Sequence, residues 1–244
     1  FVIGDEASNY GAGVLAGWAD GSVSVTNVVV LSSRVENTDA NGRLNIGAVV
    51  GTNLQDANIH FESITVSGVE LVQPSGTAGG LIGSIGLAGN VTPAVTVSNV
   101  DIINVELLNG GTGTQPGGIA GNVKNASTLQ IVRTSVDFDF NALDSGYGGG
   151  LFGKLVNSNQ QPGLAQVIVR EVQLLGYNLT ADPASGNERD GPISSVIGFS
   201  GIPISVSLTD VILDVPNAND GDGRFSLAEE AYGTVSFELA RIVL

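Results

Sequence analysis

Residues Gly79-Gly80-Leu81-Ile82-Gly83 read GGLIG, two small and two apolar residues closed by a glycine. A single pentad of this kind would be a turn or a piece of buried strand, but this one recurs at intervals of about 32 to 45 residues. Such intervals are typical of solenoids, propellers and repeat arrays. The other copies are Gly13–Gly17 (GVLAG), Gly47–Gly51 (GAVVG), Gly117–Gly121 (GGIAG), Gly149–Gly153 (GGLFG) and the weaker Ser194–Gly198 (SSVIG).

After each pentad, a variable polar linker leads to a longer run in which apolar and polar residues alternate. Alternation with a period of two, rich in β-branched residues, predicts a strand with one buried side. A small or polar residue near the middle of each run, such as Asn27 or Asn99, predicts a bend between two short strands. The runs begin at Val23, Ile59, Val95, Leu129, Val167 and Val206.

The pentad and the two halves of the long run give about three short strands per repeat. A propeller blade of this length would need four strands, and blades usually carry a repeated motif of aromatic residues, which this chain lacks. We therefore predict an all-β, single-domain, right-handed parallel β-helix (β-solenoid) of about six to seven three-strand coils. The glycines would let one side of the coil turn tightly and lie close to its neighbours, with each pentad acting as one strand of the stack. The expected interior ladder is Leu15, Val49, Leu81, Ile119 and Leu151.

The composition limits the partners and the chemistry of the chain. Its 244 residues carry a formal net charge of −15, which argues against nucleic acid and anionic membranes as partners. No run approaches the roughly 18 apolar residues of a membrane span. The absence of cysteine excludes disulfides and thiolate chemistry. The chain also lacks methionine, even at its first position, so we expect a processed N-terminus or a cut fragment.

The pentads resemble the GLUG motif, a Gly-Leu-any-Gly repeat of β-solenoid regions in large bacterial surface proteins and adhesins. The resemblance spans roughly residues 11–215: GGLIG and GGLFG match closely, GGIAG and GAVVG loosely, and SSVIG poorly. It implies a secreted or cell-surface protein that is repetitive and non-enzymatic, and it carries over no functional residue. We therefore assign residues 1–215 to the β-solenoid repeats and residues 216–244 to a modified C-terminal coil with an acidic loop and a terminal strand.

The modified coil contains the best local motif, in the segment Asp220–Glu229. An EF-hand loop needs oxygen ligands at set positions and glycine at the sixth, which Gly223 provides. Position 1 is Ala218, and the segment before the loop is a strand instead of a helix, so the motif departs from the family pattern. The residues predict a calcium site, with an acidic surface turn as the alternative. The candidate ligands are Asp220, Asp222, Ser226 and Glu229.

Other polar groups favour structural explanations. The run 137–141 (DFDFN) favours a strand with its phenylalanines inward over a cation- or sugar-binding ridge. Arg133 and Arg170 are expected at the strand breaks, in surface pairs with acids such as Glu171 that contribute little stability. His60 is the single histidine of the chain and cannot build a zinc site alone.

No set of catalytic residues emerges, so we predict a non-enzymatic extracellular structural protein, self-associating or adhesive, with surface glycans as further partners. The alternative is a carbohydrate-binding or carbohydrate-active β-helix, which would need clustered acids with Arg or Lys in one groove. The chain has only nine Lys and Arg residues, and its acids are scattered. Ice binding needs regular threonine ladders, and the outward positions here are too irregular.

Self-association is expected at the ends of the solenoid. A parallel β-helix exposes unpaired backbone groups at each end, and soluble examples cover them with a helix or a polar cap. The sequence shows no such device at its start, so we predict a head-to-tail homopolymer. The rival explanation is that covalent neighbours in a longer solenoid cover both ends. The predicted contact residues are Phe1, Val2, Ile3, Phe237, Leu239, Ile242 and Leu244.

Overall fold

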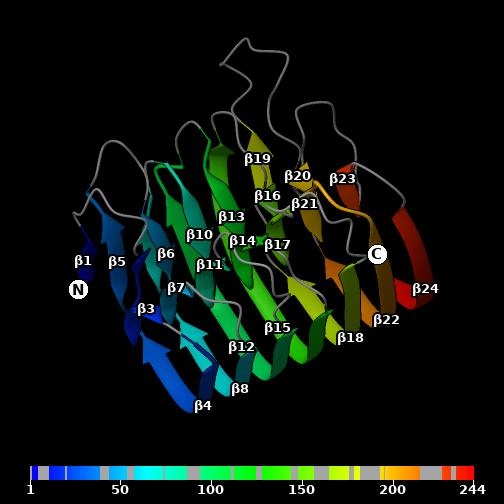
Figure 1. The fold of residues 1–244 in the computed structure, drawn as a ribbon, viewed down its shortest axis with the longest axis horizontal. Coiled ribbons are helices and arrows are strands. Elements are labelled where there is room, and N and C mark those ends of the chain that lie inside the picture. Colours follow the sequence, from blue (N-terminus) through cyan, green and yellow to red (C-terminus); the bar gives the residue numbers. More distant parts are fainter. Residues whose placement is uncertain are drawn as a thin grey trace.

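A computed structural model shows an all-β chain wound into a parallel β-solenoid (Figure 1). Every strand pairing in it is parallel, as the fold prediction requires. The structure describes residues 2–4, 11–19, 21–38, 44–53, 58–73, 75–86, 94–110, 113–124, 128–143, 148–156, 165–175, 179–181, 193–194, 196–214, 227–231 and 235–244.

The strands form three sheets, and successive coils add one strand at a time to each sheet. Sheet A holds β1 (Val2–Gly4), β4 (Val23–Leu31), β5 (Arg34–Asn37), β8 (Ile59–Ser67), β9 (Glu70–Val72), β12 (Ala94–Leu108), β15 (Thr128–Leu143), β18 (Ala165–Leu175), β19 (Leu179–Ala181), β22 (Ile204–Asp214) and β24 (Val235–Val243). Sheet B holds β2 (Gly11–Ala12), β6 (Asn45–Gly47), β10 (Thr77–Gly79), β13 (Gln115–Gly117), β16 (Gly148–Gly149) and β20 (Ile193–Ser194). Sheet C holds β3 (Ala16–Ala19), β7 (Val50–Asn53), β11 (Ile82–Ile85), β14 (Ala120–Lys124), β17 (Phe152–Val156), β21 (Ile197–Ser200) and β23 (Ala228–Ala231).

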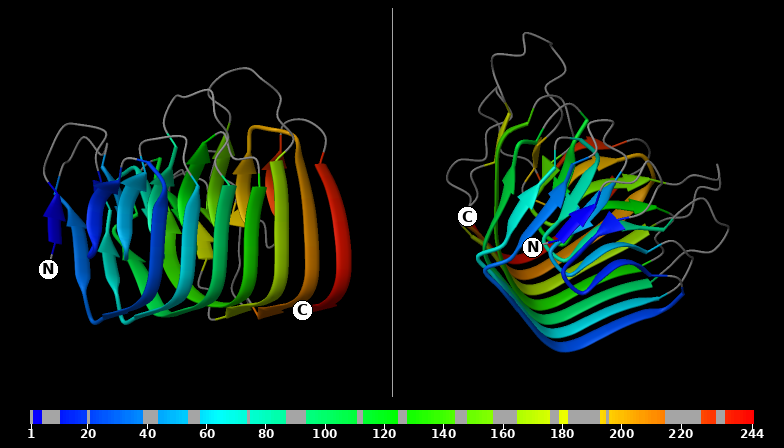
Figure 2. Two further views of the ribbon diagram at one scale, coloured as in Figure 1. Left: turned by 60° about the horizontal axis from the view of Figure 1, so that its bottom comes forward. Right: turned by 90° about the vertical axis from the view of Figure 1, so that its left-hand side faces the viewer.

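The coils stack along one axis, with β1 at one end and β24 at the other (Figure 2). The number of full coils differs slightly from the six to seven uniform coils expected. The last coil contributes β23 and β24 but has no sheet B strand within the described residues. Those residues contain no helix long and apolar enough to cross a membrane.

Each pentad forms a corner between sheets B and C, where the sequence had suggested one strand. In the third coil, β10 ends at Gly79 and β11 begins at Ile82, so GGLIG covers the turn between them. The predicted interior ladder is present in the middle coils, where Val49 and Leu81 are fully buried. The prediction is wrong for Leu15, which is 56% exposed, because no further coil covers the first one in the described structure. Ile119 and Leu151 complete the buried ladder.

The last glycine of each pentad is where sheets B and C touch. A Cβ atom on Gly83 would lie 2.5 Å from the carbonyl oxygen of Ile46, in β6 of the preceding coil. On Gly121 it would lie 2.7 Å from the amide nitrogen of Ala78, in β10. Side-chain carbons do not approach backbone atoms this closely, so only glycine allows the two sheets to meet. Neither glycine has a positive φ, so close contacts require the glycine: at Gly83 they are with the preceding coil, and at Gly121 they also include the carbonyl oxygen of Gln115 in its own coil, at 2.4 Å.

The long strands of sheet A bend at a row of residues in the left-handed region. Strand pairing places one such residue above the next in seven successive strands, with φ between 48° and 56°. The predicted mid-run bend is therefore confirmed, with one correction: Glu171 occupies the bend of β18, and Arg170 precedes it. The row, called the bend ladder below, consists of Asn27, Ser63, Asn99, Arg133, Glu171, Asp210 and Arg241.

The core lies inside the coil and is mostly aliphatic, because the alternating runs turn one side of sheet A inward. Phe138 and Phe140 of β15 are fully buried with ring centroids 6.1 Å apart, as the strand interpretation of DFDFN predicts. Asp137 and Asp139 alternate with them and are half-buried. The Asp137 carboxylate accepts a hydrogen bond from the Asn104 backbone amide at 3.1 Å, so it supports the next bend of β12.

Replacing Gly83 with alanine is expected to reduce the free energy of unfolding by about 1 to 3 kcal/mol, because the new methyl group meets backbone atoms of the preceding coil. Gly17 is the matched control, since it has the same pentad position in the first coil. There the new Cβ atom would come closer than 3 Å only to the carbonyl oxygen of Gly11. Chemical unfolding of both variants tests this, and equal losses would contradict the contact between coils as the cause.

Candidate assembly interface

The C-terminal end of sheet A exposes residues that belong to interior ladders. β24 pairs with β22, and its other edge is unpaired among the described residues. Phe237 lies beside Val206 and Leu239 beside Leu208. Val206 and Leu208 are 1% and 0% exposed, whereas Phe237 and Leu239 are 42% and 52% exposed. The same inward positions are therefore buried within the stack and open at its end.

The other predicted contact residues at this end follow the same pattern. Ile242 continues the ladder of Val211, which is fully buried, and is itself half-buried. Leu244 is 83% exposed. The structure therefore gathers Phe237, Leu239, Ile242 and Leu244 along one edge strand and its end, as the sequence had suggested.

The N-terminal end is also apolar, but its exposed residues are mostly ones that the sequence analysis missed. Leu15 and Trp18 are 56% and 50% exposed in the first coil. On β4, whose outer edge is unpaired among the described residues, Val29 and Leu31 are 64% and 60% exposed. The sequence did contain a sign of this exposed surface. In the run VSVTNVVVL the outward positions before the bend are polar, whereas those after it, Val29 and Leu31, are apolar.

The predicted N-terminal contact residues lie in a strand of the chain's own sheet. In β1, Val2 pairs with Val35 and Ile3 with Glu36, so this segment covers the edge of β5. The expectation of an uncovered start is therefore wrong for this part of the first coil. Phe1 lies outside the described residues.

An ion pair fixes the last bend of β24. Arg241 donates from Nε and Nη2 to the two carboxylate oxygens of Asp210, its neighbour in the bend ladder. The guanidinium lowers the pKa of Asp210, and the carboxylate raises the pKa of Arg241. A related contact joins two inner coils, where Arg133 Nε donates to Asn99 Oδ1 at 2.8 Å. The surface pairs predicted for Arg133 and Arg170 with acids are not among these contacts.

At the other end of the stack, Arg34 links two strands. Its Nη1 donates to Glu70 Oε2 at 2.8 Å, and its Nε donates to Glu36 Oε2 at 3.2 Å. These hydrogen bonds raise the pKa of Arg34. The three groups are partly or well exposed, so they orient the surface more than they stabilise it.

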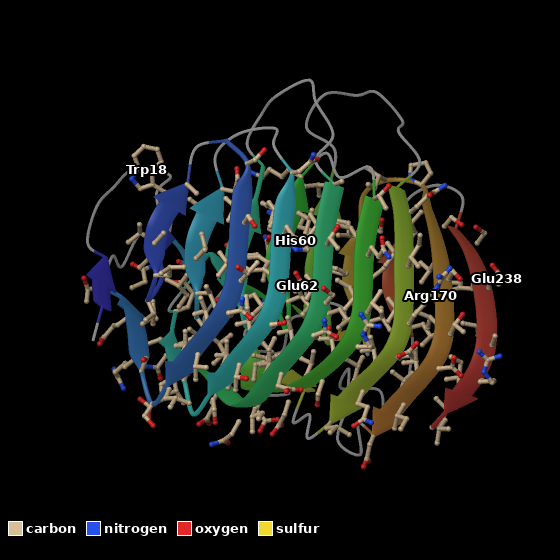
Figure 3. The ribbon with its side chains drawn as sticks, turned by 90° about the horizontal axis from the view of Figure 1, so that it is seen from below. Trp18, His60, Glu62, Arg170 and Glu238 are labelled. Carbon is tan, nitrogen blue, oxygen red and sulfur yellow. The ribbon has the colours of Figure 1, made fainter. Side chains whose placement is uncertain are left out.

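The charged residues on the outer side of sheet A do not form one cluster. Figure 3 shows His60 and Glu62 together on β8, Arg170 farther along the sheet on β18, and Glu238 on β24. His60 Nε2 lies 3.4 Å from Glu62 Oε2, and both side chains are well exposed. Within the described part of the chain, no group of three or more His, Cys, Asp or Glu residues is placed to hold a metal ion.

The predicted calcium ligands Asp220, Asp222 and Ser226 lie outside the described residues. Glu229 belongs to β23, but only its backbone is described. The prediction of a calcium site therefore stays a prediction.

Buried polar groups inside the coil are mostly structural. Asn37 Nδ2 donates to Gln73 Oε1 at 2.6 Å, and Gln73 Nε2 donates to the carbonyl oxygens of Leu44 and Thr77. This network satisfies the buried side-chain amides of Asn37 and Gln73 and connects them to the backbone beside sheet B. Burial lowers the pKa of Lys124 at the end of β14.

No protein-family model, curated protein or solved structure matches the chain.

The Asp210 pair makes the last strand sensitive to acid. Because the folded-state pKa of Asp210 is lowered, its contribution is present above the ordinary value of 3.8 and is lost as pH falls through the lower folded value. Asp210→Asn is expected to increase hydrogen exchange in β24 at pH 6, with the difference shrinking as the pH falls below 3.8 and the carboxylate is protonated. Asp101→Asn, on β12, is the control. A difference that persists in acid would contradict the role of the carboxylate.

Proposed function

We propose that the chain is a non-enzymatic structural subunit that associates end to end with copies of itself. The observation that carries this proposal is the exposure of inward-facing residues at the ends of the stack, Phe237 and Leu239 at one end and Leu15 at the other. These positions are buried in the inner coils because a neighbouring coil lies on each side of them. A second copy supplies such a neighbour.

Backbone chemistry favours the same contact. The free edges of β24 and β4 each carry N–H and C=O groups that a parallel strand satisfies, as every inner strand of sheet A shows. The two edges are different surfaces, so joining them gives a heterologous contact that repeats from copy to copy. The product is an open filament and not a closed dimer.

The proposal includes an extracellular, cell-surface location with an adhesive role. It is supported by the resemblance of the pentads to the GLUG motif and by the parallel β-solenoid that this resemblance implied. In such a protein the sides of the filament remain available for other partners, because association uses only the ends.

A charge on the inward side of β24 is expected to prevent association. Leu239→Lys places an ammonium group where the next coil would cover it, which should raise the concentration needed for assembly at least about tenfold. Ala240→Lys is the matched control, because Ala240 is the next residue on the same strand and lies at an outward position. Sedimentation velocity measures assembly, and circular dichroism confirms that both variants are folded.

Two outcomes would contradict the proposal. One is a wild-type chain that stays monomeric at the highest concentration attainable. The other is equal inhibition by both lysine variants, which would point to a general effect of charge on the edge strand.

Salt gives a second test, because copies with a net charge of −15 repel one another. The Debye length falls from about 30 Å at 0.01 M salt to about 8 Å at 0.15 M. Association through apolar edges should therefore strengthen as salt is added over this range, in a light-scattering titration. Weakening with salt would instead indicate a contact made by ion pairs, against the proposal.

A further inference from the structure

We infer that two copies join in register, with β24 of one copy pairing in parallel with β4 of the next so that Val243 lies beside Val29. This inference rests on the proposed function and adds to it the identity of the paired strands and their alignment. It makes the first coil of one copy the direct continuation of the last coil of another.

The interior ladders decide the alignment. Strand pairing connects Val23 through the inner coils to Phe237, and Val25 to Leu239. Both ladders are apolar in every coil. When β24 continues onto β4 with the same pairing, Phe237 covers Val23 and Leu239 covers Val25. A shift by one residue would instead place these inward apolar side chains against the outward polar positions of β4.

An outward row supports the same alignment. The row that contains Val29 and Val243 is polar in the middle of the stack, at Thr65, Asp101, Ser135 and Gln173, and becomes apolar at Ile212, beside Val243. At its ends, Val29 is 64% exposed and Val243 is 58% exposed. In register, the two valines meet and cover each other, which removes apolar surface from water on the outer side of the joint.

The strand β1 leaves room for this contact. β1 begins at Val2, which pairs with Val35, and it covers the edge of β5 only. β24 ends at Val243, in the row of Val29, and therefore lies along β4 without reaching the row of Val35. The two strands thus occupy successive parts of one edge. β1 of one copy continues the coil at the point where β24 of the other copy stops.

The charges at the two edges are compatible, although the whole chain is strongly acidic. β4 (VSVTNVVVL) contains no charged residue, and β24 (VSFELARIV) contains one acid and one base. In register, Arg241 lies beside Asn27 in the bend ladder. An arginine and an asparagine also meet in the bend ladder inside the stack, where Arg133 contacts Asn99 in the opposite order, with the arginine one strand after the asparagine.

Cysteine pairs test the register, because the natural chain contains no cysteine. In the variant V29C/V243C, six strand spacings separate the two cysteines within one copy, a distance of about 29 Å. Across an in-register joint, the cysteines of two copies lie one spacing apart, about 5 Å. A methylene-bridged bis-methanethiosulfonate, which forms a disulfide with each thiol and releases methanesulfinate, should therefore link copies into a ladder of covalent multimers. L31C/V243C is the matched control, displaced by two residues, or about 7 Å along the strand, and should link weakly. S24C/E238C is a second in-register pair and should link as V29C/V243C does.

The readouts separate the inference from the proposed function. Sedimentation velocity of the unlinked variants reports whether copies associate at all, and the covalent ladder reports how they are aligned. Association with equal linking of the displaced and in-register pairs, or with linking of neither in-register pair, would overturn the register and leave end-to-end association standing. A chain that never associates would overturn both.

Discussion

The contact between sheets B and C at the last glycine of each pentad is the constraint on which the rest of the solenoid depends. A Cβ atom there would lie 2.3 Å from a backbone atom of the preceding coil at Gly51, 2.5 Å at Gly83 and 2.5 Å at Gly153. The two backbones therefore meet without a side chain between them, which makes one corner of the coil narrow. The interior of the coil is filled mostly by aliphatic ladders, and the same corner must recur in each coil for the coils to stack.

Recurrence explains why the fold was predictable from the sequence. A glycine that must contact the next coil leaves a periodic signal, and the alternation of the long runs marks which side of sheet A faces inward. The position of the pentad within the coil was less accessible, because a short run of small and apolar residues such as GGLIG fits both a buried strand and a corner. Leu15 shows a second limit. Its burial depends on whether another coil lies beside it, and residue type carries no information about that.

The bend ladder shows what local preference predicts and what it does not. Asn27 and Asn99 tolerate the left-handed region better than most residues, and their sequence positions indicated the bend. Ser63, Arg133 and Glu171 adopt the same conformation without such a preference, at a cost of order 1 to 3 kcal/mol each. The strands on either side impose the bend on them, because each coil must follow its neighbour to keep the backbone hydrogen bonds of sheet A. The neighbouring strands therefore set the backbone conformation at these positions, and the conformational preferences of single residues do not predict the whole bend ladder.

The same dependence on neighbours accounts for the ends. Each inner coil is stable because it has a partner on both sides, so its inward residues are buried and its edges are paired. Within the described residues, the first and last coils each have a full neighbouring coil on one side, and the ladders that hold the stack together continue to Leu15 and Phe237, which are exposed. β1 adds a short strand on β5, which covers part of the first coil and leaves β4 open. The interaction that builds the solenoid is therefore also the one available at its ends. The proposed joint supplies a further coil in the same register at these ends.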